Sequence, residues 1–289
     1  MGNVIFDPTD FGSGSYVGGR VSMNKDGTII SLATRDGSIA AGSRVQVYEW
    51  DGADWIKRGQ DLAGFYVSDF NDTGDTIVCG EKFANSGVGR MNVYDWNGSS
   101  WVQRGLTLDG VAGEYFGNIV SIDGSGNRIC SMTVYGINNF TDGAAHVYEW
   151  DTTALQWVEL VNVIEQPGGF IAGGWSGGGL NRKGDKLFLC RNLQNTSKAH
   201  RLYQLPKYGK HWEQIGEDIL PGNESLFGTD INNNGLSSNT LDFNDDGTKL
   251  VIASPDKIKS ESIIAKYQDD LIAEYKFDSN LNDTSNSND

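Results

Sequence analysis

The chain has 289 residues, of which 38% are hydrophobic and 21% charged, and its formal net charge at pH 7 is −15. Nucleic-acid backbones and anionic membrane surfaces are both bound through lysine and arginine, so this charge argues against either as a direct partner. Thirty-eight glycines with only five prolines favour a protein of many tight hairpins, and 31 aromatic residues supply material for a core.

The chain ends and the cysteines narrow the class further. The N-terminus lacks the basic and apolar regions of a secretory signal, and no apolar run approaches the length of a membrane span. An odd number of widely spaced cysteines does not predict a disulfide framework, and each follows a glycine turn, which indicates a small buried strand residue. These cysteines are Cys79, Cys130 and Cys190.

The first predicted unit consists of four strands in chain order. Alternation predicts a strand over residues 21–23, which ends at an Asn-Lys-Asp-Gly-Thr turn over 24–28. A β-branched and apolar run over 28–33, strict alternation over 44–50 and renewed alternation from Trp55 onward predict the other three strands. No stretch of helical length has a period of 3.6 residues.

A tryptophan-rich block then recurs along the chain. It reads Val-Tyr-Glu-Trp-Asp-Gly-Ala-Asp-Trp-Ile-Lys-Arg-Gly over residues 47–59 and Val-Tyr-Asp-Trp-Asn-Gly-Ser-Ser-Trp-Val-Gln-Arg-Gly over 93–105. More divergent copies occupy 147–158, 202–216 and 264–267. Each copy follows a turn with a glycine, and the spacing of these glycines lengthens along the chain: Gly27, Gly74, Gly126, Gly184 and Gly247.

Five repeats of about fifty residues, each with four antiparallel strands, predict an all-β protein of the β-propeller class. One such unit cannot bury both of its faces, so it must stack on its neighbours. We therefore expect a propeller of five blades over residues 1–268. A β-sandwich is the alternative fold, although a sandwich does not require a repeated motif.

The repeats resemble a known family in three features. These are Phe-Gly before the first strand, the Asp-Gly-Thr turn, and the tryptophan block that ends in Arg-Gly. With Phe-Gly at 11–12, 116–117 and 227–228, residues 11–268 resemble the FG-GAP-like, integrin-type β-propeller repeats of marine bacterial, phage and giant-virus surface proteins. The resemblance implies a surface or structural protein.

The C-terminal segment over residues 269–289 has a second resemblance. An apolar-Tyr-x-Phe-Asp strand over 271–278 and an Asn-Asp-x-Ser loop over 282–285 resemble the start of a laminin-G or concanavalin-like jelly roll. The segment is therefore either the start of such a domain or an outer strand that closes the propeller.

The sequence offers no catalytic constellation. Its histidines, His146, His200 and His211, are scattered, and the Phe-Gly-Ser-Gly-Ser segment over 11–15 lacks the strand-turn-helix context of a nucleophile elbow. We therefore predict that the protein is not an enzyme and needs no cofactor.

Calcium is the one cofactor alternative. Asp242, Asn244 and Asp246 match the start of an EF-type calcium loop, with Gly247 at its sixth position. The twelfth position is Ala253 where such a loop has its bidentate glutamate. A hairpin turn without metal is the competing interpretation.

Three pairs of tryptophans flank hairpin turns and are the candidate ligand-binding residues. In the structural interpretation each pair stacks across its hairpin and joins the outer strands, whereas in the functional one the pairs are aromatic platforms for sugars. The residues are Trp50, Trp55, Trp96, Trp101, Trp150 and Trp157.

Together these features predict a structural or adhesive module at a virion or extracellular surface. It would serve as a surface, appendage or tail-fibre protein that displays its propeller for assembly or for attachment to host glycans. Its expected partners are other structural proteins of the same particle and surface glycans. The alternatives are a carbohydrate-binding adhesin fragment of a large cellular surface protein and an intracellular protein-interaction propeller.

Overall fold

The computed structural model describes residues 16–35, 43–133, 144–160, 164–165, 175–191, 200–207, 211–219, 241–243 and 250–252. Within these ranges the protein is built from β-strands, and its single helix is the four-residue α1 (Ala84–Gly87). None of the described helical structure is long and apolar enough to cross a membrane.

The strands form antiparallel sheets of consecutive segments, each with one inner strand and an outer edge. The first sheet contains β1 (Tyr16–Met23), β2 (Ile29–Arg35), β3 (Arg44–Trp50), β4 (Trp55–Lys57) and β5 (Leu62–Ala63). The second contains β6 (Val67–Phe70), β7 (Thr76–Glu81), β8 (Arg90–Trp96), β9 (Trp101–Gln103) and β10 (Leu108–Asp109). In both, the outermost strand is split into two short pieces that pair with the same neighbour.

The later sheets repeat this plan. The third contains β11 (Ile119–Ile122), β12 (Arg128–Met132), β13 (Ala144–Asp151), β14 (Gln156–Glu159) and β15 (Ile164–Glu165). The fourth contains β16 (Trp175–Leu180), β17 (Lys186–Arg191), β18 (His200–Gln204) and β19 (Glu213–Ile219). Of the fifth, the described part is the hairpin of β20 (Leu241–Phe243) and β21 (Leu250–Ile252).

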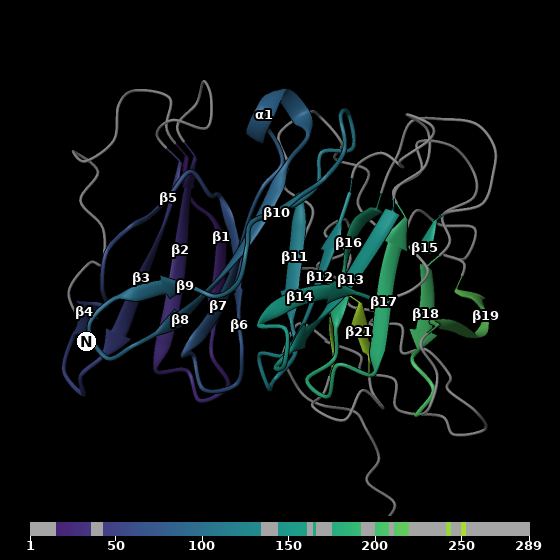
Figure 1. Cartoon of the computed structure of the whole chain (residues 1–289). Helices are drawn as coiled ribbons and strands as arrows, with labels where there is room; N and C mark the ends of the chain where they lie inside the picture. The colour runs from purple at the N-terminus through teal and green to yellow at the C-terminus, as the bar shows by residue number, and fades with distance from the viewer. Residues whose placement is uncertain are drawn as a thin grey trace, which may run out of the picture.

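The sheets are the blades of a β-propeller, here numbered 1 to 5 in chain order. Their inner strands follow one another around the hub: β1 contacts β6, β6 contacts β11, β11 contacts β16, and β16 contacts β20. Figure 1 shows the blades standing side by side. The predicted fold class is confirmed, and the strand predicted over 44–50 is β3. The predicted closing segment over 269–289 lies outside the described residues.

A buried asparagine or aspartate shapes the turn after each of the first four inner strands. Asn24 is 2% exposed, and its Oδ1 accepts hydrogen bonds from the backbone N–H groups of Thr28 and Ile29. Gly27 in this turn has a φ of 75°, which favours glycine. The same position is held by Asn71, Asp123 and Asn181 in blades 2 to 4. The recurring sequence landmark is therefore a side-chain-capped hairpin.

The turns also bind one another around the hub. The N–H of Asp72 donates to the carbonyl of Gly124 at 3.0 Å, and the N–H of Gly124 donates to the carbonyl of Arg182 at 2.7 Å. Arg182 reaches further, because its Nη1 donates to the carbonyl of Phe70 in blade 2 at 2.7 Å. This end of the propeller is thus held by bonds between blades that are not neighbours as well as between those that are.

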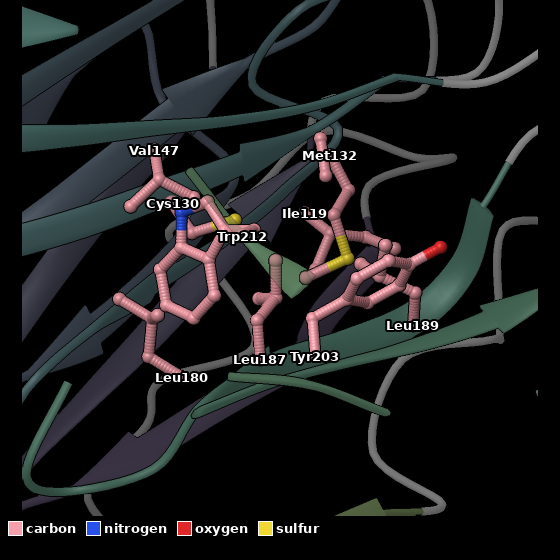
Figure 2. Close-up of a cluster of buried hydrophobic side chains, with 10 residues drawn as sticks. Ile119, Cys130, Met132, Val147, Leu180, Leu187, Leu189, Tyr203 and Trp212 are labelled. Atoms are coloured by element: carbon pink, nitrogen blue, oxygen red, sulfur yellow. The ribbon is translucent and has the colours of Figure 1, made fainter. Parts of the chain in front are cut away.

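The hydrophobic core lies between the blades. In the cluster of Figure 2, Ile119, Cys130 and Met132 of blade 3 face Leu187 and Leu189 of blade 4. Cys79 and Cys130 are free and fully buried, as predicted, and burial raises the pKa of both thiols. Stacking of repeated sheets therefore supplies the burial that one sheet could not achieve alone.

Candidate functional site

The six candidate tryptophans form three similar ring pairs, here called the tryptophan stacks, one in each of blades 1 to 3. In each pair the two residues are direct cross-strand partners at a hairpin. Their ring centroids lie 5.5 Å apart for Trp50–Trp55, 5.3 Å for Trp96–Trp101 and 5.2 Å for Trp150–Trp157. The two rings of each pair therefore meet across the hairpin, as predicted. Their planes are inclined by 57°, 54° and 63°, so the contact is tilted to edge-on and not a face-to-face stack.

An arginine of the preceding blade covers the stack of blade 2. The guanidinium carbon of Arg58 lies 4.8 Å from the ring centroid of Trp96 and 5.8 Å from that of Trp101. Nε1 of Trp101 donates to the carbonyl of Arg58 at 2.9 Å, and Trp101 is 3% exposed. A cation over two indole faces, with the indole N–H bonded to backbone, joins blade 1 to blade 2.

The next pair of blades repeats this contact. The guanidinium carbon of Arg104 lies 4.4 Å from the ring centroid of Trp150 and 5.2 Å from that of Trp157. Nε1 of Trp157 donates to the backbone carbonyl of Arg104 at 3.1 Å. We call the two contacts the Arg–Trp joints: Arg58 with Trp96 and Trp101, and Arg104 with Trp150 and Trp157.

The glycine after each arginine is part of the joint. Gly59 has a φ of 80°, and a Cβ on it would lie 2.6 Å from Cζ3 of Trp96. At Gly105, with a φ of 75°, a Cβ would lie 2.9 Å from Cζ3 of Trp150. The Arg-Gly pair of the sequence motif therefore serves the following blade, a role that the motif alone does not reveal.

Blades 3 and 4 meet through a different set of residues, here called the Leu–Trp joint: Leu160, Leu205 and Trp212. The N–H of Leu160 donates to the carbonyl of Val147, just as the N–H of Arg104 donates to the carbonyl of Val93, so Leu160 occupies the position of the arginine. Likewise, the N–H of Leu205 donates to the carbonyl of Asp185 at 2.8 Å. Leu205 therefore occupies in blade 4 the position that Trp150 occupies in blade 3. Leucines therefore replace both the arginine and the first tryptophan of the joint.

The tryptophan stack of blade 1 differs in its surroundings. Trp50 and Trp55 are both half-buried, and no arginine covers them among the residues that the structure describes. Ile56, which follows Trp55 on β4, is 51% exposed. This edge of blade 1 thus presents aromatic and apolar surface.

A charged cluster that the sequence did not predict lies in blade 3; two of its three members are buried, and the third, Glu159, is exposed. Its centre is His146 on β13, whose Nε2 lies 2.5 Å from Oε1 of Glu114 and whose Nδ1 lies 2.6 Å from Oε1 of Glu159. Burial opposes the charged form of His146, but the bonds to both carboxylates outweigh it and raise its pKa to about 9. No spacing in the sequence links residues this far apart.

The cluster keeps His146 in its charged form at neutral pH. Glu114 is 1% exposed and also accepts a bond from the backbone N–H of Val111. Since each ring nitrogen of His146 meets a carboxylate, both nitrogens donate, and the ring is charged. The cluster fastens the loop before β11 to the third and fourth strands of blade 3.

The predicted calcium ligands are only partly within the described residues. Asp242 lies on β20, whereas Asn244 and Asp246 lie outside them. Across the described ranges no group of three His, Cys, Asp or Glu side chains is placed to hold a metal ion. In the corresponding turn of blade 1, Oδ1 of Asp26 accepts bonds from Asn24 and Thr28, so the turn holds its shape through protein hydrogen bonds.

Comparisons with known proteins bear on the fold. No protein-family model matches the chain, and no curated protein matches it. Among solved structures, it is similar to a putative 6-phosphogluconolactonase from Bacteroides uniformis ATCC 8492, with 11% identity, a TM-score of 0.50, and coverage of 93% of this chain and 84% of that one. A structure from a study of two prolyl endopeptidases matches with 9% identity, a TM-score of 0.51, and coverage of 91% and 35%.

A third match is the β-propeller domain of the Trilobed protease from Pyrococcus furiosus, with 11% identity, a TM-score of 0.42, and coverage of 71% of this chain and 58% of that one. At such identities the likeness concerns the fold, and the activities in these titles belong to those proteins.

Proposed function

We propose that the protein is a non-enzymatic structural and adhesive module of a particle surface, such as a virion surface, appendage or tail-fibre protein. The observation that carries the proposal is the contrast among the tryptophan stacks. Those of blades 2 and 3 are covered by Arg58 and Arg104, whereas the stack of Trp50 and Trp55 has no such cover among the described residues. The particle setting is supported by the resemblance of the repeats.

The adhesive part of the proposal is assigned to the Trp50–Trp55 edge. Indole faces pack against the apolar face of a sugar ring while the N–H group stays available for hydrogen bonds. Both rings are half-buried, which holds them in place and leaves surface for a ligand. The adjacent exposed Ile56 extends this surface.

The structural part is assigned to the outer rim. Equivalent residues on the outer strands of blades 1 to 3 are large and exposed: Ile56 at 51%, Val102 at 47% and Val158 at 41%. Exposed apolar side chains on short edge strands are suited to contacts with other proteins. A row of them at one repeat position offers several similar contacts, which add through effective concentration.

A glycan array tests the adhesive role. The intact chain is applied with calcium and with chelator, beside the double variant W50A/W55A and the control Val102→Ser on blade 2. We expect binding to a defined glycan that the tryptophan variant loses and the control keeps. Loss of binding with chelator would support the calcium loop at Asp242; absence of binding in every arm would refute the adhesive role.

The structural role is tested separately, in particles and cell lysate prepared from the organism or virus that carries the gene. An antibody against the chain should detect it in purified particles, at a constant ratio to a major structural protein. Detection only in cell lysate, never in particles, would overturn the proposed particle setting.

A further inference from the structure

An arginine in blade 1 occupies a repeat position that is apolar or glycine in blades 2 to 4. Arg20 lies four residues before the turn-capping Asn24, as Val67 lies before Asn71. The residues at this position in blades 3 and 4 are Ile119 and Gly177. Val67 and Ile119 are each 3% exposed, whereas Arg20 at the same position is only partly buried. The fold therefore places a partly buried cation at a position that is core in blades 2 and 3.

The surroundings of Arg20 join the first three inner strands. Its guanidinium carbon lies 5.9 Å from the ring centroid of Tyr66, just before β6. The hydroxyl of Tyr66 donates to Oδ1 of Asn118, just before β11, at 3.4 Å. Tyr66 and Asn118 share one repeat position and are both 8% exposed. One buried tyrosine thus contacts an arginine at one end and an asparagine at the other.

The charge of Arg20 is not balanced by a carboxylate among the described residues. Burial lowers the pKa of its guanidinium, which still remains charged at neutral pH. Several other arginines of this acidic chain meet a carboxylate: Arg58 lies 3.2 Å from Glu49, and Arg128 lies 2.6 Å from Glu149. A cation that is partly withdrawn from water is destabilising unless a counterion meets it.

We propose that Arg20, Tyr66 and Asn118 form a binding site for a small carboxylate or phosphate anion at the start of the inner strands. The planar fork of the arginine matches two oxygens of such an anion. Asn118 uses its Oδ1 to accept the bond from Tyr66, which leaves its amide N–H groups as the donors that an anion would need. The site is independent of the Trp50–Trp55 edge and of the proposed particle setting.

Thermal unfolding and calorimetry with simple anions test this site. Phosphate and acetate are titrated against chloride at constant ionic strength, so that general screening is equal in all arms. We expect at least one of them to raise the Tm in a saturable way, because a ligand that binds the folded state stabilises it. The anion that binds more tightly shows whether the site prefers a phosphate or a carboxylate.

Two variants and a control make the result specific. R20V introduces the residue of blade 2 at this position, and R20Q keeps polarity without charge. Both should weaken anion affinity by roughly tenfold or more, whereas K25M, which removes an exposed cation of the same blade, should keep it. No saturable shift in the unmodified chain, or an equal shift in R20V and R20Q, would overturn the proposal.

Discussion

The Arg–Trp joints and the Leu–Trp joint solve one problem in two ways. In blades 2 and 3, a stack of two tryptophans receives an arginine from the blade before. In blade 4, Leu205 replaces the first tryptophan, and the preceding blade contributes Leu160 in place of arginine. The cation and the first of the two rings that it covers are thus absent together, while Trp212 remains.

This difference teaches that the unit of the repeat motif extends across two blades. An arginine held against leucine would lose its favourable contact with an aromatic face and still be withdrawn from water, while a leucine against a tryptophan stack forfeits the cation–π attraction. The cation–π contact contributes about 0.5–2 kcal/mol, and burial of a leucine contributes about 1.5–3 kcal/mol. Either solution is therefore adequate, provided that both sides match.

The largest effect is expected at the buried tryptophan of the first joint. W101A removes a ring that is 3% exposed together with its bond to Arg58, and should lower the free energy of unfolding by about 3–5 kcal/mol in chemical denaturation. W55A, in the half-buried stack of blade 1, is the matched control and should cost less. Equal losses would show that the arginine-covered position is not special.

The next effect is pH dependent and lies outside the joints. His146 has a pKa of about 9 when folded and about 6.5 when unfolded, so its stabilisation is complete below pH of about 6.5 and is lost as pH rises toward 9. By linkage this amounts to about 3 kcal/mol. H146Q should remove this slope, measured as the free energy of unfolding against pH, and the exposed-residue variant H211Q should retain it.

A smaller effect separates backbone strain from contact within a joint. Gly105 and Gly52 both have positive φ, at 75° and 101°, but a Cβ on Gly105 would meet the rings of Trp150 and Trp157, whereas a Cβ on Gly52 would meet nothing within 4 Å. G105A should therefore cost about 1–3 kcal/mol more than G52A in thermal or chemical unfolding. Similar costs for the two would mean that the ring contact contributes nothing.

Much of the fold could be predicted because it is local and repeated. Alternation and glycine turns predicted the strands of blade 1, and the number of strands per repeat predicted the propeller. The tryptophan pairs also followed from sequence, since Trp50 and Trp55 flank a turn of four residues, 51–54. These properties depend on residues only a few positions apart.

The contacts between blades could not be predicted in the same way. Arg58 and Trp96 are far apart along the chain, and only the stacking of blades brings them together. The same holds for His146 and Glu114, whose spacing follows no motif. Side-chain burial decides these contacts, and a strand pattern gives the face of a residue but not its neighbour in the next blade.

A double-mutant cycle on Arg104 and Trp150 tests most directly whether the two act as a unit between blades. R104L, W150L and R104L/W150L are compared with the unmodified chain by chemical denaturation, since the double variant carries the leucines of the Leu–Trp joint. We predict that the double variant is more stable than the summed single losses indicate, by about 1 kcal/mol. Strict additivity of the two losses would contradict the account.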